Sequence, residues 1–417
     1  MHILFLTDNF APEVNAPASR SFEHCREWVE AGHQVTVITG APNFPLGIVF
    51  PGYRNRLWQT EDLSGIRVIR IWTFIAPNEG FFWRTLDFLS FMLVGFLASL
   101  LVRRVDAVIG TSPQFFTVWA AWAASLVHRA PFIFELRDLW PDSVRAVGIL
   151  RHRRLLDLIG RAELFLYRRA AQIVVVTHSF KRILVARGID PQKIAVVTNG
   201  VDLKRFLPLP KDKALEAELG LQGCFVAGYI GTHGMAHGLD TVLDAARQLR
   251  NRNESCVRIL MLGSGSEKKT LKVRAKDEGL TNVLFLDTVN KGEVVRYWSL
   301  LDLSIIHLRR DPLFRSVIPS KLFEAMATGT PVLLGVEGEA AQIVTRHEVG
   351  VALAPDDAAC LAQTILALRD DPYTRQRYRE NGMRAARRFA RPVLALSMLS
   401  AIEGVVQDAR ASEPRIG

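Results

Sequence analysis

The sequence has 417 residues, of which 49% are hydrophobic and 23% are charged. This balance is typical of a chain that buries a core, and it excludes disorder, collagen-like repeats and a coiled coil. Lysine and arginine number 52 against 42 aspartates and glutamates, a net charge of +10 that favours an acidic partner such as nucleic acid, an anionic membrane or a phosphorylated substrate. The four cysteines are scattered, which argues against a zinc site or disulfide framework and favours a reducing compartment.

Short runs rich in Val, Ile and Leu alternate with helix-length segments along nearly the whole chain. The first run ends at Asp8 and has no basic leader, so it predicts a strand rather than a signal peptide. Because the runs lack polar alternation, they predict parallel strands covered on both faces, in an α/β fold with doubly wound sheets. The predicted strands are residues 3–6, 34–39, 68–71, 107–110, 132–135, 173–176, 226–230, 257–262, 283–286, 303–306 and 332–334.

A second strand–helix series begins after Pro208 and Pro210, which stand beside a charged cluster. We therefore expect two Rossmann-like domains, residues 1–205 and 206–385, followed by residues 386–417. In such pairs the domains face each other across a cleft, and the ligand lies at the carboxyl ends of the strands.

The segment Leu86–Val102 carries Asp87 as its one charge and is flanked by arginines. It is slightly short for a membrane span. Three readings stay open: a helix packed on the sheet, a helix lying on or half-inserted in a membrane surface, and a true span. The basic clusters 151–154 and 161–169 fall in the same half of the chain and favour contact with an anionic membrane. No nucleic-acid-binding module is recognisable, so nucleic acid is not the expected partner.

The most specific motif runs from Ile318 to Val332. Ser320 is suited to begin a helix as its N-cap and Gly329 to end it. A helix start presents free backbone amides that suit a phosphate, and Lys321 would add a positive charge there. Glu324, one turn later, is placed to accept hydrogen bonds from the hydroxyls of a ribose.

This motif resembles the signature of family 4 glycosyltransferases, which have the GT-B fold. The loop 8–20 resembles the acceptor-side loop of that family. The run 137–143, Arg-Asp-Leu-Trp-Pro-Asp-Ser, is similar to the branch that builds O-antigens, capsules and colanic acid, and within it to the L-fucosamine transferase type. The resemblance covers almost the whole chain.

The resemblance implies retaining transfer of a sugar from a nucleotide donor, without a metal or cofactor. The donor would be UDP-linked and perhaps an amino- or deoxy-hexose such as N-acetyl-L-fucosamine, bound by the C-terminal domain. The acceptor would be an undecaprenyl-diphosphate-linked glycan bound by the N-terminal domain, at the cytoplasmic face of the inner membrane. Residues 386–417 would form a helix that crosses back to the N-terminal domain.

By position, the resemblance implies three sets of site residues. The donor set is Gly231, Thr232, His233, Gly234, His237, Gly263, Ser264, Gly265, Arg309, Ser316, Ser320, Lys321 and Glu324. The acceptor set is Asn15, Arg20 and Arg137, and the catalytic set is Asp138, Glu13 and Lys321. His233 and His237 are expected beside the diphosphate rather than on a metal, because no third ligand accompanies them.

The sequence departs from its relatives at three places. Ser316 stands where many carry a glutamate that touches the donor hexose, and Thr232 and His237 replace an arginine and a lysine that grip the diphosphate. Arg137-Asp138 stands where many have a His-Asp pair. Two alternatives to a transferase stay open: a sugar-nucleotide epimerase or hydrolase of the same architecture, and a non-catalytic scaffold.

Overall fold

The computed structural model describes residues 1–13, 15–44, 47–75, 81–139, 152–254, 256–290 and 292–412. They form two compact units, one of residues 1–199 and 391–417 and the other of residues 200–390. The Trp140–Ser143 part of the predicted branch motif and the basic residue Arg151 lie outside the described residues.

Unit 1 is built on an eight-stranded sheet in the order β3-β4-β2-β1-β5-β6-β7-β8. All neighbours pair in parallel except β3, which runs antiparallel to β4. The strands are β1 His2–Leu6, β2 Gln34–Gly40, β3 Trp58–Leu63, β4 Ile66–Ile71, β5 Ala107–Thr111, β6 Phe132–Leu136, β7 Gln172–Val175 and β8 Ile194–Val196. The helices are α1 Ala16–Glu30, α2 Phe81–Ser99, α3 Phe115–His128, α5 Arg153–Arg169, α6 His178–Ala186, the 3₁₀ turn η1 Pro191–Lys193, and α15 Arg391–Ser412.

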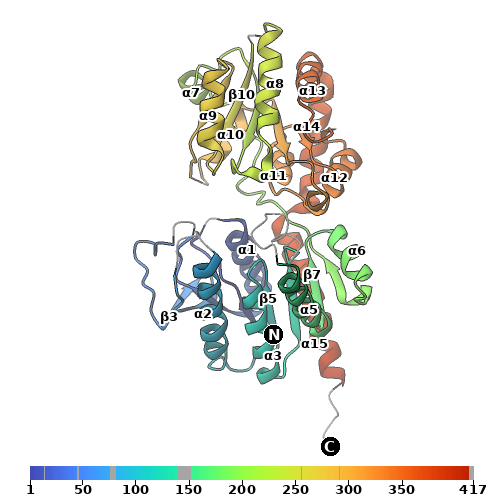
Figure 1. Ribbon diagram of the computed structural model, residues 1–417. Coiled ribbons are helices and arrows are strands. Elements are labelled where there is room, and N and C mark those ends of the chain that lie inside the picture. The colour runs from blue at the N-terminus through green and yellow to red at the C-terminus, as the bar shows by residue number, and fades with distance from the viewer. Residues whose placement is uncertain are drawn as a thin grey trace, which may run out of the picture. The chain divides into compact units, whose positions relative to one another are not determined.

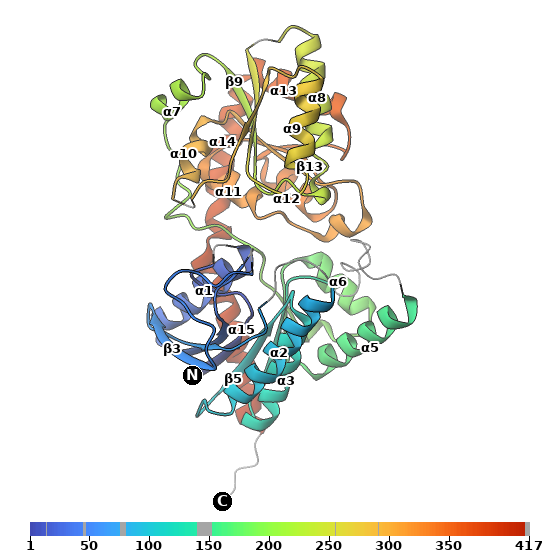
Figure 2. The same ribbon diagram turned by 60° about the vertical axis from the view of Figure 1, so that its left-hand side comes forward.

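Each face of the unit 1 sheet is covered by helices because successive side chains of a strand point to opposite faces. In β1, Leu4 and Leu6 pack with α2, α3 and α5, whereas Ile3 and Phe5 pack with α1 and α15. The ribbon shows α2 beside α3 on one face (Figure 1) and α15 beside α1 on the other (Figure 2). Parallel central strands covered on both faces are what the unbroken apolar runs predict.

Unit 2 has a six-stranded parallel sheet in the order β11-β10-β9-β12-β13-β14. The strands are β9 Phe225–Ile230, β10 Val257–Leu262, β11 Val283–Leu286, β12 Leu303–His307, β13 Val332–Gly335 and β14 Gly350–Ala352. One face is covered by α8 Asp240–Asn251, α9 Lys268–Asp277 and α13 Ala358–Asp370. The other is covered by α7 Lys213–Glu218, α10 Val294–Leu300, α11 Lys321–Thr328, α12 Glu339–His347 and α14 Pro372–Ala386. Short 3₁₀ turns are η2 Met235–His237, η3 Pro312–Ser316 and η4 Arg387–Phe389.

The observed units differ slightly from the domain limits expected from sequence. Val201 bridges to Ala390 in parallel, and its backbone N–H donates to the carbonyl oxygen of Phe389 at 2.9 Å. Residues 200–205 and 386–390 therefore group with unit 2, and the proline-rich segment lies inside that unit. From Arg391 onward the chain belongs to unit 1, where the Trp28 indole donates to the carbonyl oxygen of Ala395 at 2.8 Å.

Among the described residues, one helix, Arg391–Ala411, is long and apolar enough by length and composition to cross a membrane, and the apolar stretch 85–99 of α2 is shorter. Core helices of soluble proteins meet the same criterion. Leu394, Met398, Leu399 and Ile402 of α15 are buried in the core beside Trp28. We therefore read α15 as a helix that packs on unit 1 through one face.

Candidate functional site

The candidate donor site lies at the carboxyl end of β9, in unit 2. In the sheet, β9 has β10 on one side and β12 on the other. The strand order reverses between β9 and β12, so the topological switch point lies between these two strands. In open parallel sheets, ligands bind at this point. The loop 231–238 after β9, the loop 263–265 after β10 and the first turn of α11 carry most of the predicted donor residues.

The two glycine loops lie backbone against backbone. The N–H of His233 donates to the carbonyl oxygen of Ser264 at 2.9 Å. A Cβ on Gly263 would lie 1.9 Å from the carbonyl oxygen of Gly231, and one on Gly265 would lie 2.4 Å from that of His233. Glycine is therefore required sterically at positions 263 and 265 to shape the loop.

Lys321, the first residue of α11, points its amino group into this loop. The Nζ atom lies 3.9 Å from the centre of the Tyr229 ring, over its face, and is buried without a hydrogen-bond partner among the described residues. A Cβ on Gly231 would come within 2.5 Å of Nζ. Burial lowers the pKa of Lys321 to about 7, against the opposing effect of Glu324.

Two histidines line the same loop. Both ring nitrogens of His233 and the Nδ1 of His237 are buried and lack a hydrogen-bond partner among the described residues. Burial, with the charge of Lys268 and Lys321, lowers the pKa of His233 to about 4; burial and Lys321 do the same for His237. At neutral pH both rings are therefore uncharged, and each can present one N–H donor.

Three residues that the sequence did not single out hold this site. Tyr229 is fully buried, and its hydroxyl donates to the carbonyl oxygen of Thr232 at 2.6 Å. His307 Nδ1 donates to the carbonyl oxygen of His237 at 2.7 Å, and its Nε2 accepts from the Asp356 N–H, which fixes the neutral tautomer. Lys268 donates from Nζ to the carbonyl oxygens of Gly263 and Leu286, each at 2.6 Å, and to Asp287.

A polar residue at the carboxyl end of a buried strand is the one sequence signal that could have identified His307. Tyr229 and Lys268 give no such signal, since their roles depend on which loops the sheet brings together.

The remaining predicted donor residues are placed as follows. Gly329 ends α11 in the left-handed conformation, as predicted, with φ 71°. Ser320 precedes α11, but its own backbone is helical and its side chain makes no capping hydrogen bond, so the predicted cap is wrong. The buried Ser316 donates from Oγ to the carbonyl oxygen of Leu313 at 2.7 Å. Arg309 is exposed, and its N–H donates to the Ala236 carbonyl oxygen in the η2 turn.

The acceptor residues predicted from sequence lie in unit 1, at the carboxyl ends of β1 and β6. Glu13 is buried and accepts at Oε1 from the N–H groups of Asn43 and Phe44, both at 2.9 Å. Burial raises the pKa of Glu13 despite these two hydrogen bonds. Asn15 is the N-cap of α1 and accepts from the Ala18 N–H at 2.8 Å.

Arg20 and Arg137 meet around the buried carboxylate of Glu135. Arg20 donates to Glu135 at 2.8 Å and to the carbonyl oxygens of Val197 and Thr198. This use of its whole guanidinium in the core runs against the acceptor-binding role expected for Arg20. Burial alone would raise the pKa of Glu135, but Arg20 and Arg137 outweigh it and lower the value to about 2.

Arg137 keeps more freedom than Arg20. Its Nη1 donates to the carbonyl oxygen of Pro17 at a long 3.3 Å, and burial lowers its pKa to about 10. The N–H groups of Arg137 and Asp138 both point to Ser112 Oγ, which fixes the backbone here. Asp138 and Glu13 thus share the carboxyl edge of the unit 1 sheet, whereas Lys321 belongs to unit 2.

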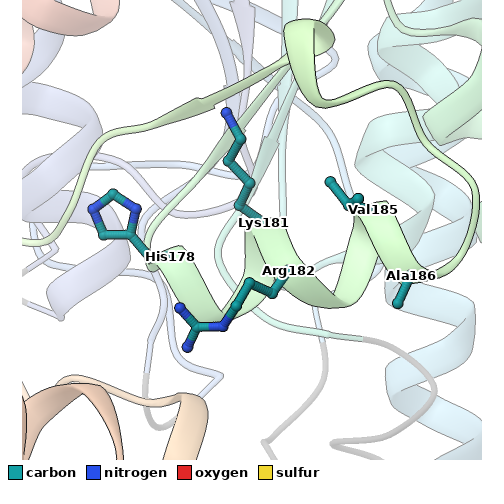
Figure 3. A pocket seen from close by; sticks show the side chains of 5 residues that line it. All are labelled: His178, Lys181, Arg182, Val185 and Ala186. Carbon is teal, nitrogen blue, oxygen red and sulfur yellow. The ribbon is translucent and has the colours of Figure 1, made fainter.

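A separate pocket lies along α6 in unit 1 (Figure 3). It is lined by His178, Lys181, Arg182, Val185 and Ala186. The figure shows the amino group of Lys181 and the guanidinium of Arg182 pointing to opposite sides of the helix, and Lys181 donates to the Ile194 carbonyl oxygen at 2.8 Å. None of the predicted site residues lines this pocket. Within the described ranges, no group of three or more His, Cys, Asp or Glu side chains is arranged to hold a metal ion.

Solved structures share the whole fold. Sucrose-phosphate synthase from Thermosynechococcus elongatus superposes with a TM-score of 0.76 at 17% identity, covering 98% of this chain and 99% of that one. HepE from Anabaena, in complex with UDP and glucose, has a TM-score of 0.71 at 17% identity, with 96% and 99% covered. The lipopolysaccharide glycosyltransferase WaaG has a TM-score of 0.65 at 15% identity, with 96% and 98% covered. The fold is GT-B.

Sequence relatives point the same way. WcaI of Escherichia coli K12, named for colanic acid biosynthesis, is 23% identical over 346 residues, which is 81% of this chain and 84% of WcaI. WbjE of Pseudomonas aeruginosa, named as a glycosyltransferase, is 22% identical over 271 residues, 63% of this chain and 66% of WbjE. Residues 16–200 match the model of the glycosyl transferase 4-like domain, and residues 214–385 match that of the glycosyl transferases group 1. The chain belongs to the GT4-type glycosyltransferases of the GT-B fold.

Proposed function

We propose that this protein transfers a sugar, with retention of configuration, from a UDP-linked donor onto a lipid-linked glycan during the synthesis of a bacterial surface polysaccharide. The observation that carries the proposal is a cluster of buried nitrogens of Lys321, His233 and His237 at the switch point of unit 2, which have no hydrogen-bond partner in the part of the chain that the structure describes. Each of these three side chains can donate at least one hydrogen bond, and a diphosphate supplies several acceptors. Glu324, one turn into α11, is assigned to the ribose.

The names of similar proteins support the donor and the pathway. HepE was crystallised with UDP and glucose, WaaG is named for lipopolysaccharide and WcaI for colanic acid. An amino- or deoxy-hexose such as N-acetyl-L-fucosamine is our choice of donor sugar. Ser316 leaves that side of the site without the carboxylate that would bind a hexose hydroxyl.

For this reaction the protein has mainly to supply hydrogen-bond donors and positive charge and to hold the substrates in position. The transition state of sugar transfer has oxocarbenium character, while negative charge grows on the departing diphosphate. Donors fixed around that diphosphate lower the barrier most. We assign this role to Lys321 and to the backbone amides of Thr232 and Gly234, since the His233 amide already donates to Ser264, and the diphosphate itself takes the proton of the acceptor hydroxyl. Glu13, Asp138 and Arg137 are assigned to orient the acceptor on unit 1.

The acceptor we propose, an undecaprenyl-diphosphate-linked glycan, places the enzyme on the cytoplasmic face of the inner membrane. The surface that supports this is a leucine stripe on α2, defined by Leu86, Leu89, Leu93 and Leu97. The spacing of three and four residues puts these leucines on one helix face, and Leu93 is 60% exposed. The opposite face packs on the sheet through Phe91, so the exposed leucines are not needed to form the core.

Positive charge accompanies this stripe. Exposed arginines follow α2, and others lie on α5, which packs on the same side of the sheet through the stacking of Phe165 on Trp119. Arg103 and Arg104 follow α2, Arg129 follows α3, and those on α5 are Arg154, Arg161, Arg168 and Arg169. Each charge near an anionic leaflet contributes about 1 kcal/mol. An apolar stripe with basic neighbours fits a helix lying on the membrane surface.

The first test is product analysis by mass spectrometry. The purified protein is given a panel of nucleotide sugars, with and without an undecaprenyl-diphosphate-linked acceptor. Sugar on the lipid supports the proposal and names the donor. A nucleotide sugar altered without any acceptor would instead indicate an epimerase or hydrolase. Glu324→Ala is expected to abolish turnover and weaken UDP binding, and near-normal activity in this variant would contradict the ribose assignment.

Membrane docking is tested by cosedimentation with vesicles containing anionic lipid. Leu93→Asp with Leu97→Asp should strongly reduce binding, because two charges enter the stripe. Val273→Asp on α9 is the matched control, since Val273 is also exposed, at 52%, but lies in unit 2. Wild-type binding should also weaken as salt rises. Binding that survives both leucine changes would contradict the assignment of this surface.

A further inference from the structure

The donor site contains one amino group, that of Lys321, whose protonation depends on which group it contacts. Lys321 Nζ has no hydrogen-bond acceptor among the described residues, and its polar contact is the face of the Tyr229 ring. A buried amino group without an acceptor favours its neutral form. A diphosphate, in contrast, binds best to an ammonium ion that can donate to it.

We propose that the donor is bound together with a proton: the diphosphate replaces the Tyr229 ring as the partner of Lys321, and Lys321 changes from amine to ammonium as it binds. Tyr229 is then a positioning residue, which holds the amino group beside Gly231 until the anion arrives. The inference rests on the proposed function, since it assumes that a diphosphate enters this loop.

The titratable groups beside Lys321 are not expected to take up the proton. Lys268 is occupied by two carbonyl oxygens and by Asp287, and His307 is held neutral by its two backbone partners. His233 and His237 both lie beside Tyr229, with ring centres 5.7 and 5.9 Å from its own, and carry no charge at neutral pH. The charged and titratable groups around Lys321 are Glu324, His233, His237, His307, Lys268, Asp287, Arg309 and Asp356.

The pH dependence follows from linkage. Because the pKa of Lys321 is about 7 before UDP is added, most molecules carry the neutral amine at pH 8. If the bound diphosphate returns that pKa toward the ordinary lysine range, about one proton enters with each UDP at pH 8. The affinity for UDP then falls about tenfold from pH 8 to pH 9, since each binding event consumes a proton.

The experiment is calorimetric titration of the full-length protein with UDP at pH 8, in phosphate and in Tris. These buffers differ in ionisation enthalpy, so the difference in apparent heat counts protons. We expect an uptake near one for the wild type. Lys321→Arg keeps a permanent charge, so it should bind UDP with little uptake and little change in affinity between pH 8 and 9. Lys321→Gln, which cannot be protonated, should bind weakly and also take up none.

Lys276→Gln is the matched control, because it removes an exposed lysine of α9 that lies outside the donor site and should keep the proton uptake. Equal heats in the two buffers with normal UDP affinity would overturn the inference and leave the proposed function standing. Uptake that persists in Lys321→Arg would also overturn it, because the proton would then belong to another group. If UDP produced no binding heat and no thermal stabilisation, the proposed function itself would fail.

Discussion

At the scale of single residues, the donor site lowers the stability of the folded state. A buried amine with no hydrogen-bond acceptor destabilises the folded state, because the unfolded chain keeps that amine hydrated and charged. Among the described residues Lys321 is in this position, and both ring nitrogens of His233 and the Nδ1 of His237 are likewise unsatisfied. Sites that bind ligands commonly give up stability in this way.

Lys321→Met is therefore expected to stabilise the empty protein while removing UDP binding. The folded-state pKa of Lys321, about 7, lies below its ordinary value, so between these values the unfolded chain binds more protons and wild-type stability rises with pH. At pH 7 the variant should melt at least about 2 °C higher than the wild type, a gain of at least 1 kcal/mol. Thermal denaturation at pH 7 and pH 9, with and without UDP, checks this.

The difference in melting temperature between Lys321→Met and the wild type should be smaller at pH 9. At that pH, keeping the Lys321 amine neutral costs the folded wild type less free energy. A variant that melts lower than the wild type at pH 7 would show that the amino group has a stabilising partner.

The residues that could be predicted from sequence are those that share a local pattern. Lys321 and Glu324 stand one turn apart at a helix start, and the Gly-Ser-Gly run follows a clear strand. Tyr229, Lys268 and His307 act from three other elements and meet the loop only because the sheet places β9, β10 and β12 side by side. The hydrogen bond of Arg20 to Glu135 could not be predicted for a related reason: Glu135 lies 115 positions away in the chain.

At the scale of elements, the central strands were predictable and the edges were not. The buried strands are unbroken apolar runs, and all of these appear in the sheets within one or two residues of the predicted limits. In β3, the sequence Trp-Gln-Thr-Glu-Asp-Leu alternates between exposed and half-buried positions, so it lacks that signal. The strands β8 and β14 have three residues each, too few for a pattern, and their neighbours in the sheet define them.

The contact between the loops after β9 and β10 can be tested by one methyl group. Gly263→Ala would place a Cβ 1.9 Å from the Gly231 carbonyl oxygen at a φ of 143°, so the loops must separate. We expect a loss of about 3 kcal/mol in the free energy of unfolding and a large loss of UDP affinity. Gly292→Ala is the control, because no atom lies within 4 Å of its added Cβ. Chemical denaturation and UDP titration of both variants measure these two losses. Equal stability of the two variants would mean that the loops can accommodate the added Cβ.

At the scale of the whole molecule, the two units differ in how the chain builds them. Unit 2 is one continuous segment, residues 200–390, with hydrophobic clusters on both faces of its own sheet. Unit 1 needs both ends of the chain, since α15 returns to pack against α1. Leu394, Met398, Leu399 and Ile402 then fill the core beside Trp28, and Arg391 pairs with Glu23. Removing α15 would expose this apolar surface together with the Trp28 indole.

The two units are therefore expected to respond differently to cutting the chain. A fragment of residues 200–390 should fold cooperatively and keep a measurable affinity for UDP, because every group assigned to the donor lies within it. A chain that stops at Ala390 should lose the cooperative unfolding of unit 1 and aggregate, while UDP still raises the melting temperature of unit 2. Circular dichroism melts of the two fragments and the full chain, with and without UDP, measure both effects. If the 200–390 fragment folds but does not bind UDP, the donor site must draw on residues of unit 1, and its assignment to the switch point of β9 alone would be incomplete.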